Sequence, residues 1–176
     1  EYPFNDPGLP QQWHYYNEGS LEKAVEGAYM NLFKGWEINT GRSDVIVAVV
    51  DMGVQYDHPD LAANMWINEA EMNGTEGVDD DDNGYLDDLY GWNFAPNYDS
   101  GEIVPGYHGT HIAGTIAAVN NNGEGVCGIA GGSGNGDRVR IMTIGWSADN
   151  RQTIPNWDMF AYAADNGAVI ASCSWE

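Results

Sequence analysis

Three short runs of apolar residues stand out along the chain, each flanked by more polar stretches. Residues 45–50 read VIVAVV, six consecutive apolar residues of which five are β-branched, and RVRIMTI (138–144) and AVIASCS (168–174) have a similar character. Uninterrupted apolarity over such a length is typical of parallel strands whose two faces are both covered by helices. The pattern therefore predicts three strands of a parallel sheet.

Apolar residues spaced three and four apart predict two helices. Residues 154–167 have this spacing, with Thr153 near the helix start and Gly167 at its end. Residues 20–33 have it too, with Ser20 as the N-cap. Because strands that alternate with helices require right-handed crossovers, we expect an α/β fold, a three-layer parallel sheet with helices on both faces.

The chain is strongly acidic, with 27 aspartates and glutamates against 6 lysines and arginines and a formal net charge of -21. This charge repels phosphate groups, so we expect no nucleic-acid partner. No apolar run reaches the roughly 18 to 20 residues of a membrane-spanning helix, so we expect no membrane span. An acidic surface rich in asparagine and glycine suits a secreted or cell-surface protein. Cys127 and Cys173 lie among small or apolar residues without Cys-x-x-Cys spacing, which predicts buried thiols rather than a disulfide.

A long insertion with little periodicity, residues 61–106, follows the first strand. Its core, GVDDDDNGYLDDLYGWNF, places six carboxylates within ten residues. Two charges roughly 4 Å apart repel by about 1 kcal/mol in water and about 4 kcal/mol at an effective dielectric constant of about 20, so a compact loop needs a counter-ion. The alternating acids before Asn-Gly resemble calcium loops, although Tyr90 replaces the glutamate of an EF-hand. We predict a calcium site, with a loose solvated loop as the alternative; the candidate ligands are Asp79, Asp81, Asn83, Tyr85 and Asp88.

Asp51 and His108 are the candidate catalytic residues. Asp51 directly follows the first apolar run, and ligands bind beyond the carboxyl ends of strands in open α/β sheets. His108 opens a stretch of small residues, HGTHIAGTIAAV, that predicts a tightly packed helix. The helix dipole favours the neutral imidazole that a general base requires, and Asp51 could orient the ring. A charged strand end exposed to water is the alternative for Asp51.

His111 lies one helical turn beyond His108, and two histidines at this spacing can share a metal ion. The sequence has no H-E-x-x-H motif, and the intervening Gly109 and Thr110 bring no ligand typical of a zinc hydrolase. We interpret His111 as a structural residue, with a metallohydrolase as the alternative.

The segments VVDMGVQYDHPDL (49–61) and HGTHIAGTIAAV (108–119) together resemble the subtilisin-like serine peptidases, the subtilase family (peptidase S8). GVCGIA and RIMTIG continue the resemblance, which extends over essentially the whole chain. It implies a subtilisin-like fold with Asp51 as the aspartate and His108 as the general base of an Asp-His-Ser triad, and His111 in a supporting role. The chain 1–176 would be the N-terminal portion of a single catalytic domain, with a sheet that is incomplete at the C-terminus.

The resemblance also implies a calcium site and a substrate-binding edge. The Ca²⁺ ligands would be Asp6, Asp60, Asn122 and the backbone oxygens of Val119, Glu124 and Val126, which would tie the proline-rich N-terminal arm to the core. Two segments, IGW and SCSW, would bind the substrate backbone as an added strand and wall the pocket for one substrate side chain. Their residues in this role are Ile144, Gly145, Trp146, Ser174 and Trp175.

The chain departs from the family pattern at three points. Met52 replaces the usual serine or threonine after the aspartate, and Glu176 stands where a glycine is usual. None of the serines has the Gly-Thr-Ser-x-Ala context of the family's nucleophile. We therefore predict a calcium-stabilised, secreted serine endopeptidase that acts on proteins or peptides, and we expect this chain alone to be inactive.

A parallel sheet whose last strand ends near residue 174 leaves an unpaired apolar edge. We expect this edge to pair with the missing C-terminal portion of the domain or with a second copy of the chain. A non-catalytic, calcium-dependent binding module with the same fold is the alternative function. The two differ in whether a Gly-Thr-Ser-x-Ala segment follows downstream.

Overall fold

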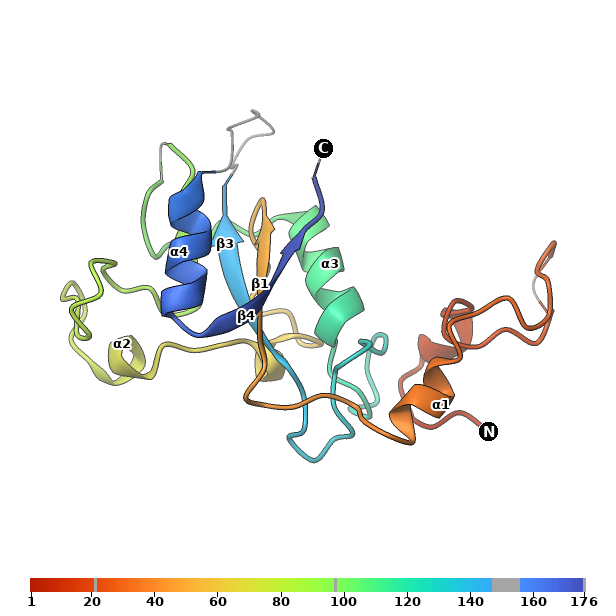
Figure 1. Cartoon of the computed structure of the whole chain (residues 1–176). Coiled ribbons are helices and arrows are strands. Elements are labelled where there is room, and N and C mark those ends of the chain that lie inside the picture. Colours follow the sequence, from red (N-terminus) through yellow and green to blue (C-terminus); the bar gives the residue numbers. More distant parts are fainter. Residues whose placement is uncertain (21, 97, 147–155, 176) are drawn as a thin grey trace.

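A four-stranded parallel sheet forms the centre of the computed structural model, which describes residues 1–176 except 21, 97, 147–155 and 176 (Figure 1). The sheet has the order β2-β3-β1-β4, so β1 lies inside it and pairs with both β3 and β4. The register places Asp51, at the end of β1, beside Gly145 of β3. The three predicted strands are therefore confirmed, and the sheet contains a fourth; the strands are β1 (Ile46–Asp51), β2 (Gly91–Asn93), β3 (Arg140–Gly145) and β4 (Ala168–Cys173).

Helices cover both faces of the sheet. The side chains of Val47 and Val49 pack on one face with α3 (Tyr107–Ala117), while those of Ala48 and Val50 pack on the other with α4 (Trp157–Asp165). Figure 1 shows the two helices on opposite sides of the strands. All six residues of β1 are buried, as the uninterrupted apolar run requires. The predicted three-layer α/β fold is confirmed.

Helix α4 is shorter than the predicted segment 154–167. Its N-cap is Asn156, whose side chain accepts a hydrogen bond from Met159 N. The predicted cap near Thr153 lies outside the described residues. Gly167 follows the helix with a φ of +86°, a conformation that favours glycine and ends the helix before β4.

The predicted helix over 20–33 is wrong. The structure has only the short helix α1 (Leu32–Trp36) there, preceded by turns in which Lys23, Gly27 and Asn31 have φ values of 65°, 82° and 57°. A side-chain hydrogen bond stabilises these turns: Asn17 Nδ2 donates to Val25 O at 3.0 Å. The arm also contains the 3-10 helix η1 (Leu9–Gln11), and its residues Leu9, Tyr15 and Trp36 form a small core with Cys127.

The insertion contributes little regular structure. It contains a 3-10 helix, η2 (Ala62–Asn64), the short helix α2 (Glu69–Asn73) and strand β2, which pairs with β3. Through β2, the insertion contributes a strand to the sheet before helix α3 begins.

The outer strand β4 is an edge of the sheet, and its surface is apolar. Val169 is 69% exposed and Ile170 is 52% exposed. Both thiols are free, which agrees with the expectation of no disulfide, but only Cys127 is buried. The prediction for Cys173 is wrong, because that residue is exposed on this edge strand. No helix among the described residues is long and apolar enough to cross a membrane.

Candidate active site

Asp51 and His108 lie in contact at the carboxyl end of the sheet. His108 Nδ1 is 2.8 Å from Asp51 Oδ2 and 3.0 Å from Oδ1, and Met52 N donates to Oδ1 at 2.8 Å. The Asp51 side chain is 4% exposed, whereas that of His108 is 43% exposed. A buried carboxylate beside Nδ1 favours the tautomer with its proton on Nδ1, which leaves Nε2 as the acceptor nitrogen of the ring.

Strand β1 and helix α3 each place one member of this pair. Asp51 is the last residue of β1, and His108 lies in the first turn of α3, as the sequence predicts. Glycines let the two elements approach closely. A Cβ on Gly109 would lie 2.3 Å from Gly53 O and 3.2 Å from Asp51 Oδ1, and a Cβ on Gly53 would lie 2.0 Å from Val104 O. No residue larger than glycine fits these two positions without a shift of the backbone.

The residues expected to bind substrate gather at the same edge of the sheet. Trp146 N donates to Asp51 O at 3.0 Å, and the ring of Trp146 meets that of Trp175 edge-on with centroids 5.9 Å apart. Ser174 and Trp175 directly follow β4, whose Cys173 pairs with Val50 in β1. The side chain of Ile144 is buried in the core, so this residue could reach a substrate only through its backbone.

His111 makes none of the contacts described for this pair. It is exposed and lines a cavity of about 700 Å³ together with His14 and His58, between the N-terminal arm and α3. Its carbonyl oxygen accepts a bond from Thr115 Oγ1 at 3.0 Å. Among the described residues, the one group of three or more side chains close enough to share a metal ion contains no histidine. The geometry gives a shared metal at His108 and His111 no support.

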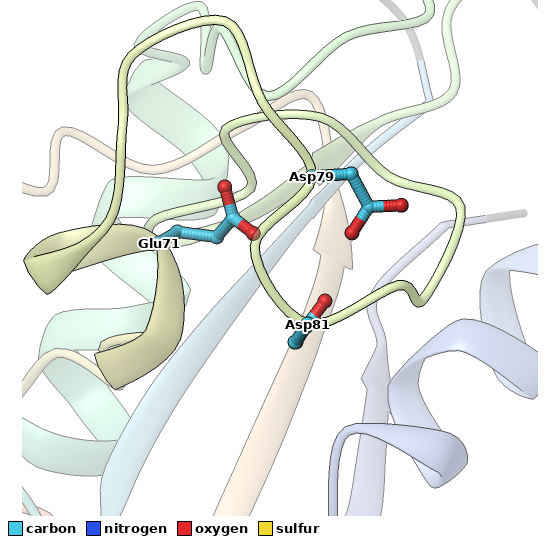
Figure 2. Close-up of side chains that lie close together, drawn as sticks. All are labelled: Glu71, Asp79 and Asp81. Carbon is cyan, nitrogen blue, oxygen red and sulfur yellow. The ribbon is translucent and has the colours of Figure 1, made fainter.

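That group lies in the acidic insertion and consists of Glu71, Asp79 and Asp81, whose carboxylate oxygens lie within 4.8 Å of one another (Figure 2). Two of its members are predicted ligands. Glu71 was missed, although it follows the N-cap Asn68 by three residues in a pattern typical of a helix start. Its carboxylate instead accepts from Asp80 N at 2.8 Å and from Asp87 N at 3.1 Å, which draws the loop around it.

The other predicted ligands of the insertion have protein partners. Asp88 is fully buried and accepts bonds from Tyr162 OH at 2.6 Å, from Asn68 Nδ2 at 2.7 Å and from Asn83 Nδ2 at 3.2 Å. Burial raises the pKa of Asp88, and these bonds act to lower it. The ring of Tyr85 packs edge-on against Trp92 and Tyr162. Asp88 and Tyr85 therefore anchor the loop to α4 and β2.

The residues of the second expected calcium site also meet. Asp6 and Asp60, 2% and 4% exposed, both contact the loop 119–126. Asn122 Nδ2 donates to Asp60 Oδ1 at 2.8 Å, and Asp6 accepts from Asn121 N at 2.7 Å. Burial raises the pKa of Asp60, and the charge of Asp6 adds to this effect. Two buried carboxylates without a basic partner among the described residues are a donor set that suits a hard cation.

The N–H groups of the three residues expected to bind calcium through their backbone oxygens all donate to protein acceptors. Glu124 and Val126 direct their N–H groups at Asn122 Oδ1 and Asp60 Oδ2, at 2.8 and 2.9 Å, and Val119 N donates to Asp60 O at 2.9 Å. The loop is therefore tied to both carboxylates. Coordination by the backbone oxygens of these three residues stays a prediction.

Comparisons with known proteins place the chain in one family. The model of the subtilase family of S8 peptidases matches residues 42–176. Subtilisin-like protease 1 of Plasmodium vivax is 49% identical over 134 residues, 75% of this chain and 19% of that protein. The extracellular basic protease of Dichelobacter nodosus is 37% identical over 142 residues, 73% of this chain and 21% of that protein. The crystal structure of a serine protease of Aeromonas sobria superimposes with a TM-score of 0.63 and 25% identity, covering 97% of this chain and 24% of that one. The chain thus spans about a fifth of the length of these curated relatives.

Proposed function

The chain belongs to the subtilase family, and from this premise we propose that it supplies the aspartate and the general base of a serine endopeptidase. The observation that carries the proposal is the contact of 2.8 Å between His108 Nδ1 and the buried Asp51 carboxylate. His108 Nε2 would take the proton of a serine hydroxyl as that oxygen attacks the peptide carbonyl. Asp51 would hold the ring in this tautomer and stabilise the imidazolium that forms.

The nucleophile has to come from outside this chain. No serine has the family's Gly-Thr-Ser-x-Ala context, and no described serine is hydrogen-bonded to His108. We therefore propose that the chain alone does not hydrolyse peptide bonds. A base without a nucleophile leaves only a small residual rate.

Protein or peptide chains are the proposed substrates. Because β3 and β4 end beside the Asp51–His108 pair, the residues that follow them could bind an extended peptide as an added strand. The edge-on rings of Trp146 and Trp175 would form an apolar wall for one of its side chains.

Calcium is the proposed structural cofactor at two places. Asp6, Asp60 and Asn122 would hold one ion and link the N-terminal arm to the core, since Asp6 belongs to the arm whereas Asp60 and Asn122 do not. Asp79 and Asp81 with Glu71 would hold another in the insertion. A bound cation would offset the repulsion between carboxylates at each place and would take no part in the proton transfer.

Two further proposals concern location and assembly. The relative from Dichelobacter nodosus is named as extracellular, which supports secretion of this protein as well. The exposed apolar residues of β4 support pairing of this edge with a further strand, either the continuation of the same domain or a second copy.

The test of the catalytic proposal uses peptidase activity of the complete protein. His108→Ala should lower kcat by roughly 10⁶-fold and Asp51→Ala by roughly 10⁴-fold. His111→Ala, one turn further along the same helix, is the matched control and should keep most of the activity. Full activity of His108→Ala, or turnover by the purified 176-residue chain that His108→Ala abolishes, would refute the proposal.

A further inference from the structure

A threonine hydroxyl bridges the start of α3 to the loop that follows β1. Thr110 Oγ1 donates to Gly106 O at 2.6 Å and accepts from Gln55 N at 2.9 Å. Gly106 is the N-cap of α3, and Gln55 lies four residues beyond the end of β1. The hydroxyl therefore uses its donor on the helix and an acceptor site on the loop.

The two segments joined by this bridge are those that carry the candidate catalytic pair. Asp51 is the last residue of β1, directly before the loop, and His108 precedes Thr110 by two residues. Within the described residues, the hydrogen bonds between α3 and residues 51–55 are the His108–Asp51 contact and this bridge. The close packing of Gly109 against Gly53 O limits how closely the two segments approach, but repulsive contacts do not prevent the segments from separating. The hydrogen bond from Gln55 N to Thr110 Oγ1 opposes that separation.

We propose that Thr110 is a positioning residue that holds His108 at hydrogen-bonding distance from Asp51. The proposal rests on the function proposed for that pair and adds a residue that acts through the positions of Asp51 and His108. Without the hydroxyl, Gln55 N–H loses its acceptor inside the protein, which costs more than the bond itself contributed. The loop regains a partner only by moving toward water, and that movement draws Met52 N, which donates to Asp51 Oδ1 at 2.8 Å, and with it the carboxylate, away from His108.

The Nδ1 proton of His108 reports this geometry directly. In the ¹⁵N-labelled 176-residue chain, a proton shared with a buried carboxylate should give a downfield resonance that exchanges slowly with water. Thr110→Val, which keeps the shape and removes the hydroxyl, should broaden this resonance or raise its exchange rate about tenfold, the effect of one lost hydrogen bond. Thr110→Ser keeps the hydroxyl and should restore the wild-type signal.

Thr115→Val is the matched control. Thr115 Oγ1 makes the same type of bond within α3, to His111 O at 3.0 Å, but does not reach the loop. This variant should leave the resonance unchanged. An equal loss in Thr115→Val would mean that helix stability, and not the bridge, sets the signal, and would overturn the proposal.

The remaining outcomes are also distinct. A wild-type resonance that Thr110→Val leaves unchanged in a folded chain overturns the positioning role alone. A wild-type chain without the resonance, or one in which Asp51→Asn does not affect it, overturns the proposed catalytic pair and this inference with it. If Thr110→Val and Thr110→Ala both fail to fold while Thr110→Ser folds, the hydroxyl serves folding and the positioning role is wrong.

Discussion

Replacing Gly109 by alanine should separate His108 from Asp51 without changing either residue. A Cβ at this position would lie 2.3 Å from Gly53 O, whereas carbon and oxygen atoms in ordinary contact are at least 3.4 Å apart. The helix must therefore move away from the loop by about 1.1 Å, the difference between these two distances. Added to the 2.8 Å between His108 Nδ1 and Asp51 Oδ2, this displacement gives about 3.9 Å, which is too long for a hydrogen bond.

The expected effect on activity is larger than that on stability. A misplacement of about 1 Å near reacting groups can cost about 100-fold in rate, so kcat of the complete protein should fall by about that factor. Overpacking should cost about 1–3 kcal/mol, and the higher helix propensity of alanine offsets about 1 kcal/mol of it. The net loss in the free energy of unfolding is then about 0–2 kcal/mol, measured by urea unfolding of the same variant.

Gly114→Ala is the matched control, because it lies on the same helix and a Cβ there would meet nothing within 4 Å. It should stabilise the protein by up to about 1 kcal/mol and leave kcat unchanged. The reasoning fails if Gly109→Ala retains wild-type kcat while folded, since the close approach would then not set the distance between the pair. It also fails if the two variants lose activity equally.

Three other changes test the surroundings of the site. Removing calcium with a chelator should increase cleavage near Asp6 by an added protease before it alters the unfolding of the sheet, and unchanged cleavage would contradict the calcium proposal. Burial alone would raise the pKa of Asp137, but hydrogen bonds from Thr40 and Ser133 lower it to about 2. This carboxylate therefore stabilises the folded state above its unfolded pKa of about 3.9, and urea unfolding should show that contribution lost as the pH falls toward about 2, a dependence that Asp137→Asn abolishes. Tyr162→Phe removes the hydroxyl donor of a fully buried carboxylate and should cost about 1–3 kcal/mol in urea unfolding; a cost below about 0.5 kcal/mol would show that the carboxylate finds another donor.

The sheet could be predicted from the sequence because its strands are buried on both faces. Residues 46–50 of β1 are buried between helices and neighbouring strands, so each of these positions is apolar, and β3 departs from this rule among its buried residues only at Thr143. β4 lies at the edge of the sheet and is largely exposed, but it is also composed mostly of apolar residues. Asp51 could be located for the same reason, as the first charged residue where such a run stops.

Segment 20–33 shows where the helical pattern fails. Its apolar residues have helical spacing, but Val25 is 69% exposed and Met30 is 54% exposed, so no core faces the helix that the spacing predicts. Helices of this length gain most of their stability from packing an apolar face. Lys23 and Gly27 instead adopt left-handed backbone conformations, which a helix does not accommodate, and the aromatic side chains of the arm pack against one another.

Strand β2 and Glu71 could not be predicted because distant contacts define them. β2 has three residues and no apolar run, and it exists through its pairing with β3. A Cβ at Gly91 would lie 1.8 Å from Thr143 O, so the pairing depends on a glycine whose role is visible only once both strands are placed. Glu71 joins Asp79 and Asp81 through a loop closure that no local pattern records.

In the motif HGTH, the residues with reactive side chains differ from those that fix the spacing of its elements. The two histidines carry the reactive side chains, and only His108 contacts the Asp51 carboxylate. The two residues between them, which bring no reactive group, set the distance: Gly109 leaves space for the loop after β1, and Thr110 binds that loop. A chain that kept Asp51 and His108 but carried larger or apolar residues at these two positions would retain the acid–base groups and lose the contact between them. The residues between the two histidines therefore bear on the distance between His108 and Asp51 as well as on the helix.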